Sequence, residues 1–202
     1  LARLEAFSPG ASPTAGLLAS ALLPDESLVR FLRGPDGPDS RLSEICEWLP
    51  VQVDDSFDTL MLEDDLLTAL QALSQAPRLL AAFQGQPGGS QHAAAKLLAA
   101  RRGLALCHAN AAALVESRLG FKAALELLLR SGEFNHALIL IGGAEALLND
   151  PILHSTLVES QADVVLSSST AWQPHPEHPL GMKQLIFEQP NPAARREAWQ
   201  AA

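Results

Sequence analysis

The sequence predicts a mainly α-helical protein, either a multi-helix bundle or a set of stacked helical hairpins. Its 202 residues are 48% hydrophobic, which is enough apolar surface for a sizeable core. Leu and Ala, both strong helix formers, supply most of that surface. Aromatic residues, which favour strands, make up only 5% of the chain, and Tyr is absent.

Proline, glycine and acidic capping residues divide the N-terminal part into short predicted helices. Proline and acidic side chains are favoured in the first turn of a helix, and Gly-Pro pairs end one. The loop 84–90 (QGQPGGS) is the strongest break in the chain. We therefore expect an acidic helical subdomain over 1–84 and a helical-hairpin region over 85–202, an arrangement also compatible with one continuous domain. The predicted helices of the first part span 24–33, 40–49, 54–73 and 77–83, with a short extended piece at 51–53.

The second part is predicted to be helical from 91 to 149, with breaks at Gly103 or Gly120 and at Ser131-Gly132. After Gly132, apolar residues recur at spacings of three and four, which indicates a one-sided helix. The last fifty residues differ, because the Pro- and His-rich stretch 173–179 (QPHPEHP) cannot be helical. We expect an irregular C-terminal extension there. It contains a short apolar run at 164–166, a strand or single helical turn at 182–187, and a last helix at 193–202.

The charge distribution excludes some partners. The net charge is −9, and residues 1–75 carry 13 acidic and 4 basic side chains, against 10 and 10 in the remainder. Nucleic acids and anionic membranes need clustered Lys and Arg, so neither is expected as a partner. No apolar run reaches the roughly 18 residues of a membrane span, and no secretory signal is recognisable. We expect a cytoplasmic protein, and a start at Leu1 rather than Met predicts a processed form or a fragment.

One segment resembles a known repeat. Residues 121–149 are similar to a single tetratricopeptide-type helical hairpin, in which small residues let two helices pack closely and a glycine makes the turn. Leu125 departs from the pattern, the terminal proline is displaced to Pro151, and no second copy exists. The resemblance implies a surface for protein contacts. Counted from Phe121, the matching positions are Ala124, Leu128, Gly132, Phe134, Ala137, Ile141 and Ala144.

The same residues allow an alternative. The passage 131–147 (SGEFNHALILIGGAEAL) also resembles part of the ketoacyl synthases and thiolases, in which Ala137 to Ile141 would be a buried strand and Gly142-Gly143 its exit. That family carries a nucleophilic Cys about one helix upstream. Here the corresponding region holds none, and Cys107 lies too far back. The resemblance therefore implies a catalytically inactive α/β domain.

We find no residues that form a catalytic, cofactor-binding or metal-ligating set. Cys107 and His108 are sequence neighbours, and on a helix they would point in different directions. His175 and His178 lie between prolines and lack further ligands nearby. The run 167–169 lacks the glycine elbow of a serine hydrolase, and Gly142-Gly143 lacks a phosphate-binding context. Cys46 and Cys107 are expected to be buried free thiols.

Together these observations predict a non-enzymatic helical module for protein–protein interaction, an adaptor or scaffold subunit of a larger complex, with no cofactor. The acidic N-terminal part suggests the partner's chemistry, because aromatic side chains ringed by carboxylates can dock a basic amphipathic segment. Neighbouring carboxylates equally suit the N-terminus of a helix. The candidate partner-binding residues are Trp48, Asp54, Asp55, Phe57, Asp58, Asp64 and Asp65.

Overall fold

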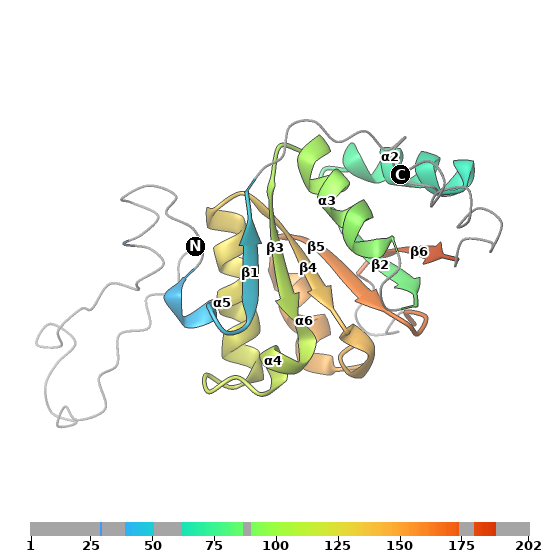
Figure 1. Ribbon diagram of the computed structural model, residues 1–202. Helices are drawn as coiled ribbons and strands as arrows, with labels where there is room; N and C mark the ends of the chain where they lie inside the picture. Colours follow the sequence, from blue (N-terminus) through green and yellow to red (C-terminus); the bar gives the residue numbers. More distant parts are fainter. Residues whose placement is uncertain (1–28, 30–38, 51–61, 87–89, 174–179, 189–202) are drawn as a thin grey trace, which may run out of the picture.

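The described part of the chain folds as a β-sheet with helices on both faces (Figure 1). The computed structural model describes residues 29, 39–50, 62–86, 90–173 and 180–188. The strands are β1 (Cys46–Leu49), β2 (Leu80–Gly85), β3 (Ala105–Asn110), β4 (Ala137–Gly142), β5 (Asp163–Ser168) and β6 (Lys183–Phe187). The α-helices are α2 (Asp64–Ser74), α3 (Gln91–Arg101), α4 (Ala111–Val115), α5 (Phe121–Phe134) and α6 (Pro151–Glu159), and two 3-10 turns are η2 (Ser40–Leu42) and η4 (Ala144–Ala146).

The six strands lie in the order β1-β3-β4-β5-β2-β6. β1 runs antiparallel to β3, and every other neighbouring pair is parallel. Parallel strands need long crossover connections, and helices α3 to α6 lie within these connections. β2 lies between β5 and β6, which are both far from it in sequence, so the chain leaves β2, builds three strands on one side and then returns.

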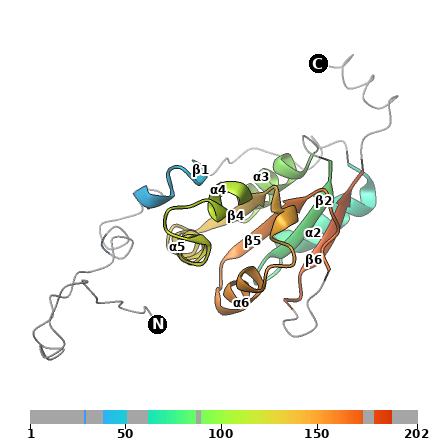
Figure 2. The ribbon, with the colours of Figure 1, turned by 90° about the horizontal axis from the view of Figure 1, so that it is seen from below.

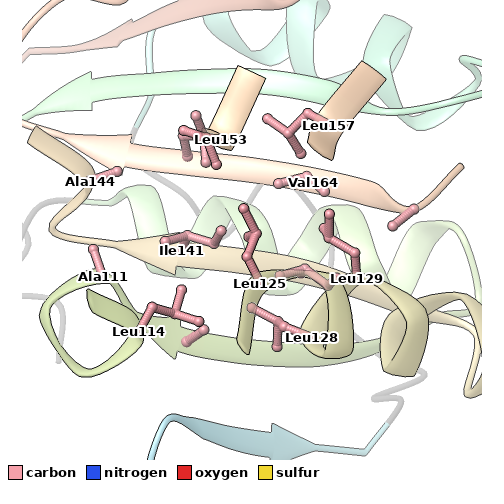
Figure 3. Close-up of a cluster of buried hydrophobic side chains, with 14 of the residues drawn as sticks. Ala111, Leu114, Leu125, Leu128, Leu129, Ile141, Ala144, Leu153, Leu157 and Val164 are labelled. Carbon is pink, nitrogen blue, oxygen red and sulfur yellow. The ribbon is translucent and has the colours of Figure 1, made fainter. Parts of the chain in front are cut away.

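Helices cover both faces of the sheet (Figure 2), and each face has its own hydrophobic core. Helices α2 and α3 cover one face, where Phe83 of β2 and Leu138 of β4 are buried beneath them. Helices α4, α5 and α6 cover the other face. Figure 3 shows this second core, in which side chains of α5 lie over β4 and those of α6 lie beside β5. Its labelled members include Leu125, Leu128, Leu129, Ile141, Leu153, Leu157 and Val164.

This architecture shows that the predicted mainly α-helical fold is wrong. The helices at 64–74, 91–101 and 121–134 do lie within predicted helical segments. The segments that form β1, β3 and β4 and most of β2 were also predicted to be helical, and each is a strand. A strand inside a parallel sheet is buried on both faces, so its sequence is a continuous apolar run with no alternation. Leu and Ala in such a run do not distinguish a strand from a buried helix.

The tetratricopeptide resemblance is also wrong, because its second helix does not exist. Residues 137–142 are β4, whose first five residues are buried. Gly132 is not a turn but a residue inside α5, and a Cβ atom placed there would lie 2.6 Å from Cδ1 of Ile139. The small residue lets α5 approach β4 closely. The turn itself is made at His136, which has a φ of 49°.

Other expectations have mixed outcomes. Residues 182–187, predicted as a strand or a helical turn, contain strand β6. Cys107 is buried and Cys46 is half-buried, and both are free thiols. No helix among the described residues is long and apolar enough to cross a membrane. The predicted helix 193–202, nearly all of 24–33 and most of the Pro- and His-rich stretch lie outside the described residues.

Candidate functional site

The carboxyl ends of β2, β4 and β5 meet the first turn of α3 at one edge of the sheet. β2 ends at Gly85, and α3 begins at Gln91 on one face of the sheet, whereas α5 and α6 lie on the other. In open parallel sheets, ligands bind outside the carboxyl ends of the strands at the point where neighbouring connections leave to opposite faces. Helix α3, which follows β2, and helix α6, which precedes β5, lie on opposite faces of the sheet. We call the residues gathered here, Gln91, His92, His108, Gly142, Ser167 and Ser168, the strand-end site.

Gln91 is the central polar side chain of this site. It is only 6% exposed. Its Nε2 donates hydrogen bonds to the backbone carbonyls of Phe83, at 3.2 Å, and Ser168, at 3.4 Å. Its Oε1 accepts a hydrogen bond of 3.0 Å from Oγ of Ser167. Both amide donors and the amide oxygen are therefore used, and the side chain ties the ends of β2 and β5 to the start of α3.

Gly85 makes room for this amide. A Cβ atom at position 85 would lie 2.9 Å from Nε2 of Gln91 and 2.8 Å from the carbonyl oxygen of Phe187. Real Cβ atoms do not approach other atoms so closely. Any larger residue at the end of β2 would displace either Gln91 or the edge strand β6.

Two imidazoles fill the neighbouring part of the site. The rings of His92, in the first turn of α3, and His108, on β3, are 4.9 Å apart between centroids and meet edge to face. Partial burial lowers the pKa of His92, and His108 and Lys96 lower it further, against an opposite influence from Glu47. Glu47 lies directly across from His108 in the strand register. His92 is therefore held towards its neutral form.

The ring of His108 covers the end of β4. A Cβ atom at Gly142 would lie 3.0 Å from Nε2 of His108, so this imidazole takes the space into which a side chain at position 142 would point. The next residue, Gly143, has a left-handed conformation with a φ of 69°. The chain therefore leaves β4 through two glycines, and neither presents a functional group to the site.

Glu145 joins the loop after β4 to the loop after β5. Its Oε1 accepts hydrogen bonds from the backbone nitrogen of Ser169, at 2.6 Å, and from Oγ of Ser169, at 2.9 Å. Burial, the largest single influence, raises the pKa of Glu145, but hydrogen bonds from Ser169 and from its own backbone lower it and prevail. The carboxylate thus stabilises the two loops, and its Oε1 already accepts two hydrogen bonds from Ser169.

The strand-end site is consequently poor in charge. Its side chains are one amide, two imidazoles and two hydroxyls, with no carboxylate or ammonium among them. Within the described ranges, no group of three or more His, Cys, Asp or Glu residues gathers so as to hold a metal ion. What the site offers a ligand is the start of a helix at the ends of parallel strands, where backbone N–H groups favour an anion.

The structure separates the described members of the predicted docking surface. Trp48 is half-buried on β1 and packs on the core beneath α5. Asp64 and Asp65 are exposed in the first turn of α2, which covers the opposite face of the sheet. Asp54, Asp55, Phe57 and Asp58 lie outside the described residues.

The strand-end site was not predicted from the sequence. His108, Gly142 and the serines at 167 and 168 were each predicted to have no functional role, and Gln91 was predicted only as the start of a helix. The available signal was the glycine-rich stretch 85–89 between an apolar run and a helix. It was interpreted as a boundary loop because the apolar run before it was taken for a helix.

Comparisons with known proteins identify the fold. No known family's sequence profile and no curated protein matches the chain. Among solved structures, the FIGL-1 AAA domain in complex with ADP has a TM-score of 0.62 and 15% identity, covering 79% of this chain and 63% of that one. A second structure of the FIGL-1 AAA domain has a TM-score of 0.64 and 14% identity, covering 82% and 66%. A structure titled for katanin self-assembly has a TM-score of 0.59 and 12% identity, covering 91% and 66%.

These likenesses show that the fold is that of AAA domains, and the chain spans 63% to 66% of the length of the structures it matches. The predicted helical adaptor or scaffold rested on a mainly helical fold and is therefore wrong, and the likeness to AAA domains contradicts the prediction of a non-enzyme. The ketoacyl synthase alternative fails as well. It placed a strand at Ala137 to Ile141, which β4 contains, but the structures matched are AAA domains.

Proposed function

We propose that this chain is an AAA-type domain that binds an adenine nucleotide at its strand-end site and works as a subunit of an assembly. The placement of β2 and α3 carries the proposal. β2 lies inside a parallel sheet and α3 begins beside its carboxyl end, at the position where nucleotide phosphates bind in strand–loop–helix folds. Two of the similar structures, the FIGL-1 AAA domain in complex with ADP and a structure that describes katanin self-assembly, support the choice of ligand and of an assembled state.

The sequence between β2 and α3 supports the proposal in part. Phosphate-binding loops of nucleotide hydrolases read G-x-x-x-x-G-K-S/T, with backbone N–H groups around the phosphates. Residues 85–92 read G-Q-P-G-G-S-Q-H. The first glycine is present at Gly85 and two more follow, but Ser90, Gln91 and His92 replace the second Gly, the Lys and the Ser/Thr. Glycines and a helix start suit phosphate groups, whereas the usual charged side chain is missing.

A magnesium ion does not fit these residues. In nucleotide hydrolases of this class the loop's Ser/Thr and an acidic residue elsewhere in the site hold Mg²⁺. Here His92 takes the place of the hydroxyl, and the end of β4 presents Gly142 and Gly143 instead of a carboxylate. Mg²⁺ prefers oxygen ligands, and the imidazoles at this site do not provide them. We therefore derive no metal-dependent step.

The nucleotide part is tested by calorimetric titration of the folded chain with ADP, with adenosine as the control. ADP should bind, and adenosine should bind more weakly because it lacks the phosphates that the start of α3 would contact. ADP should also raise the melting temperature, since a ligand that binds only the native state stabilises it. Equal affinities for ADP and adenosine would show that the phosphates do not contact the start of α3, and would contradict binding at the strand-end site.

The assembly part is tested by sedimentation velocity over a range of protein concentrations, with and without ADP. A subunit of an assembly should shift to faster-sedimenting species as concentration rises, and ADP should change that distribution. A single monomeric species under every condition would contradict self-assembly of this chain.

A further inference from the structure

Resting on the proposed function, we propose that the strand-end site takes adenosine diphosphate without a divalent cation. The inference depends on three positions at which a nucleotide hydrolase has a cation or a cation ligand. In this chain two of these positions hold side chains already engaged with the protein and the third is a glycine, so no described residue of the site would bind Mg²⁺ or the outermost phosphate of ATP.

The first position is Gln91, which stands where the loop motif has its Lys. A Lys reaches the β- and γ-phosphates with a positive charge. The Gln91 amide carries no charge and points instead to the ends of β2 and β5, bonded to Phe83, Ser167 and Ser168. To contact a phosphate it would have to give up these buried bonds, and losing a buried hydrogen-bond partner is costly.

The second position is His92, where the motif has a hydroxyl that binds Mg²⁺. Its ring packs on that of His108. The third position is the end of β4, where Gly142 has no side chain and His108 already lies within 3.0 Å of the place of a Cβ. Mg²⁺ demands near-octahedral oxygen ligands, and this corner of the site presents two imidazole rings, which offer nitrogen atoms instead.

Without a Lys and Mg²⁺, the site should bind some nucleotides better than others. ATP carries one more phosphate than ADP, and that phosphate is normally neutralised by Lys and Mg²⁺. At this site only the start of α3 offers partial positive charge, and that influence falls off within the first turn. The diphosphate is therefore the better match, and ATP gains nothing from its additional group.

The test is calorimetric titration of the wild-type chain with ADP and with ATP, each in MgCl₂ and in EDTA. We expect the Kd of ADP to be the same in both buffers within about two-fold, and ATP to bind no more tightly than ADP. Tightening of ATP binding by about ten-fold or more on adding Mg²⁺ would overturn the inference and leave nucleotide binding standing. No binding of either nucleotide in either buffer would overturn the proposed function, and this inference with it.

A second arm tests the residues named. The triple variant His92→Thr, His108→Ala and Gly142→Asp supplies a hydroxyl and a carboxylate and removes the ring that fills the space. If it folds, as circular dichroism and a cooperative melt would show, ATP binding should become tighter with Mg²⁺ than in EDTA. The control is His136→Asn, a histidine before β4 at the opposite ends of the strands, where Asn tolerates the positive φ. A folded triple variant whose ATP binding still ignores Mg²⁺ would overturn the assignment.

Discussion

Arg102 and Asp163 form an ion pair that joins the end of α3 to the first residue of β5, with Nη2 of Arg102 2.8 Å from Oδ2 of Asp163. Each partner makes a second connection. Nη1 of Arg102 donates to the carbonyl of Ala76, at 2.7 Å, just beyond α2. Oδ1 of Asp163 accepts from the backbone nitrogen of Leu79, at 2.7 Å, just before β2. The pair therefore connects α2, α3, β2 and β5 at the amino ends of the strands, opposite the strand-end site.

We expect Arg102→Met to lower the free energy of unfolding by about 3 kcal/mol, because it leaves the carboxylate of Asp163 without its partner. Both side chains are only 13% exposed. The matched control is Lys122→Met in the pair Lys122–Glu126 on α5, where the side chains are 67% and 42% exposed and 3.7 Å apart. That change should cost about 0.5 kcal/mol or less. Urea denaturation of both variants measures the difference, and equal losses would contradict the prediction.

Gly132→Ala should destabilise the protein by about 1–2 kcal/mol, although alanine favours helices, because overpacking a core costs about 1–3 kcal/mol. The new Cβ would lie 2.6 Å from Cδ1 of Ile139. Ile139→Val removes that atom, so the double variant should lose less stability than the two single losses added together. Thermal melts of the two single variants and the double variant give the coupling free energy between positions 132 and 139. A more stable Gly132→Ala protein would show that α5 does not depend on this close approach.

Acidification should destabilise the fold through His92. Its pKa is lowered in the native state by partial burial and by His108 and Lys96, against Glu47. Above the ordinary pKa of about 6.5, His92 is neutral whether folded or unfolded, and it does not affect stability. As the pH falls through that value, the unfolded chain binds the proton first, so the free energy of unfolding falls. His92→Gln should lose this part of the pH dependence between about pH 7 and 5, measured by denaturation at each pH. His136→Asn, at the opposite end of the sheet, should keep it.

The acidic residues at the start of α2 stay a proposed docking site for a basic segment. Asp64 and Asp65 lie in the first turn of this helix, where their charges also interact with the helix dipole. We expect Asp64→Lys with Asp65→Lys to lower stability by about 0.3–1 kcal/mol for each residue. If a basic partner docks there, the same variant should weaken its capture, and so should added salt. A partner bound equally well by both proteins at low and high salt would contradict docking at this surface.

The sequence allowed the helices to be located far better than the strands. α3 and α5 were predicted because long runs of helix formers are bounded by glycine and polar residues. β4, with the sequence ALILIG, was predicted to be helical because both of its faces are buried and no alternation distinguishes it. A strand of this kind is defined by its neighbours, and those neighbours lie tens of residues away along the chain.

The strand-end site was unpredictable for the same reason. Gln91 resembles any polar residue at the start of a helix until β2 and β5 are placed beside it. Its bond partner Ser167 lies 76 residues further along the chain. Recognition of the glycine-rich segment required the run before it to be a strand, so the assignment of 77–83 to a helix prevented recognition of the site.

The position of β2 between β5 and β6 also has a consequence for how the chain acquires its shape. Leu80 pairs with Val164, and Ala81 pairs with Lys183, so neither neighbour of β2 has been synthesised when the ribosome has passed it. Contacts this distant in sequence slow folding, because loop closure must precede any gain in pairing. Until residue 164 emerges, β2 is an apolar segment with both edges open, and such edges promote aggregation. We therefore expect the chain to be most prone to aggregation while its second half is being translated.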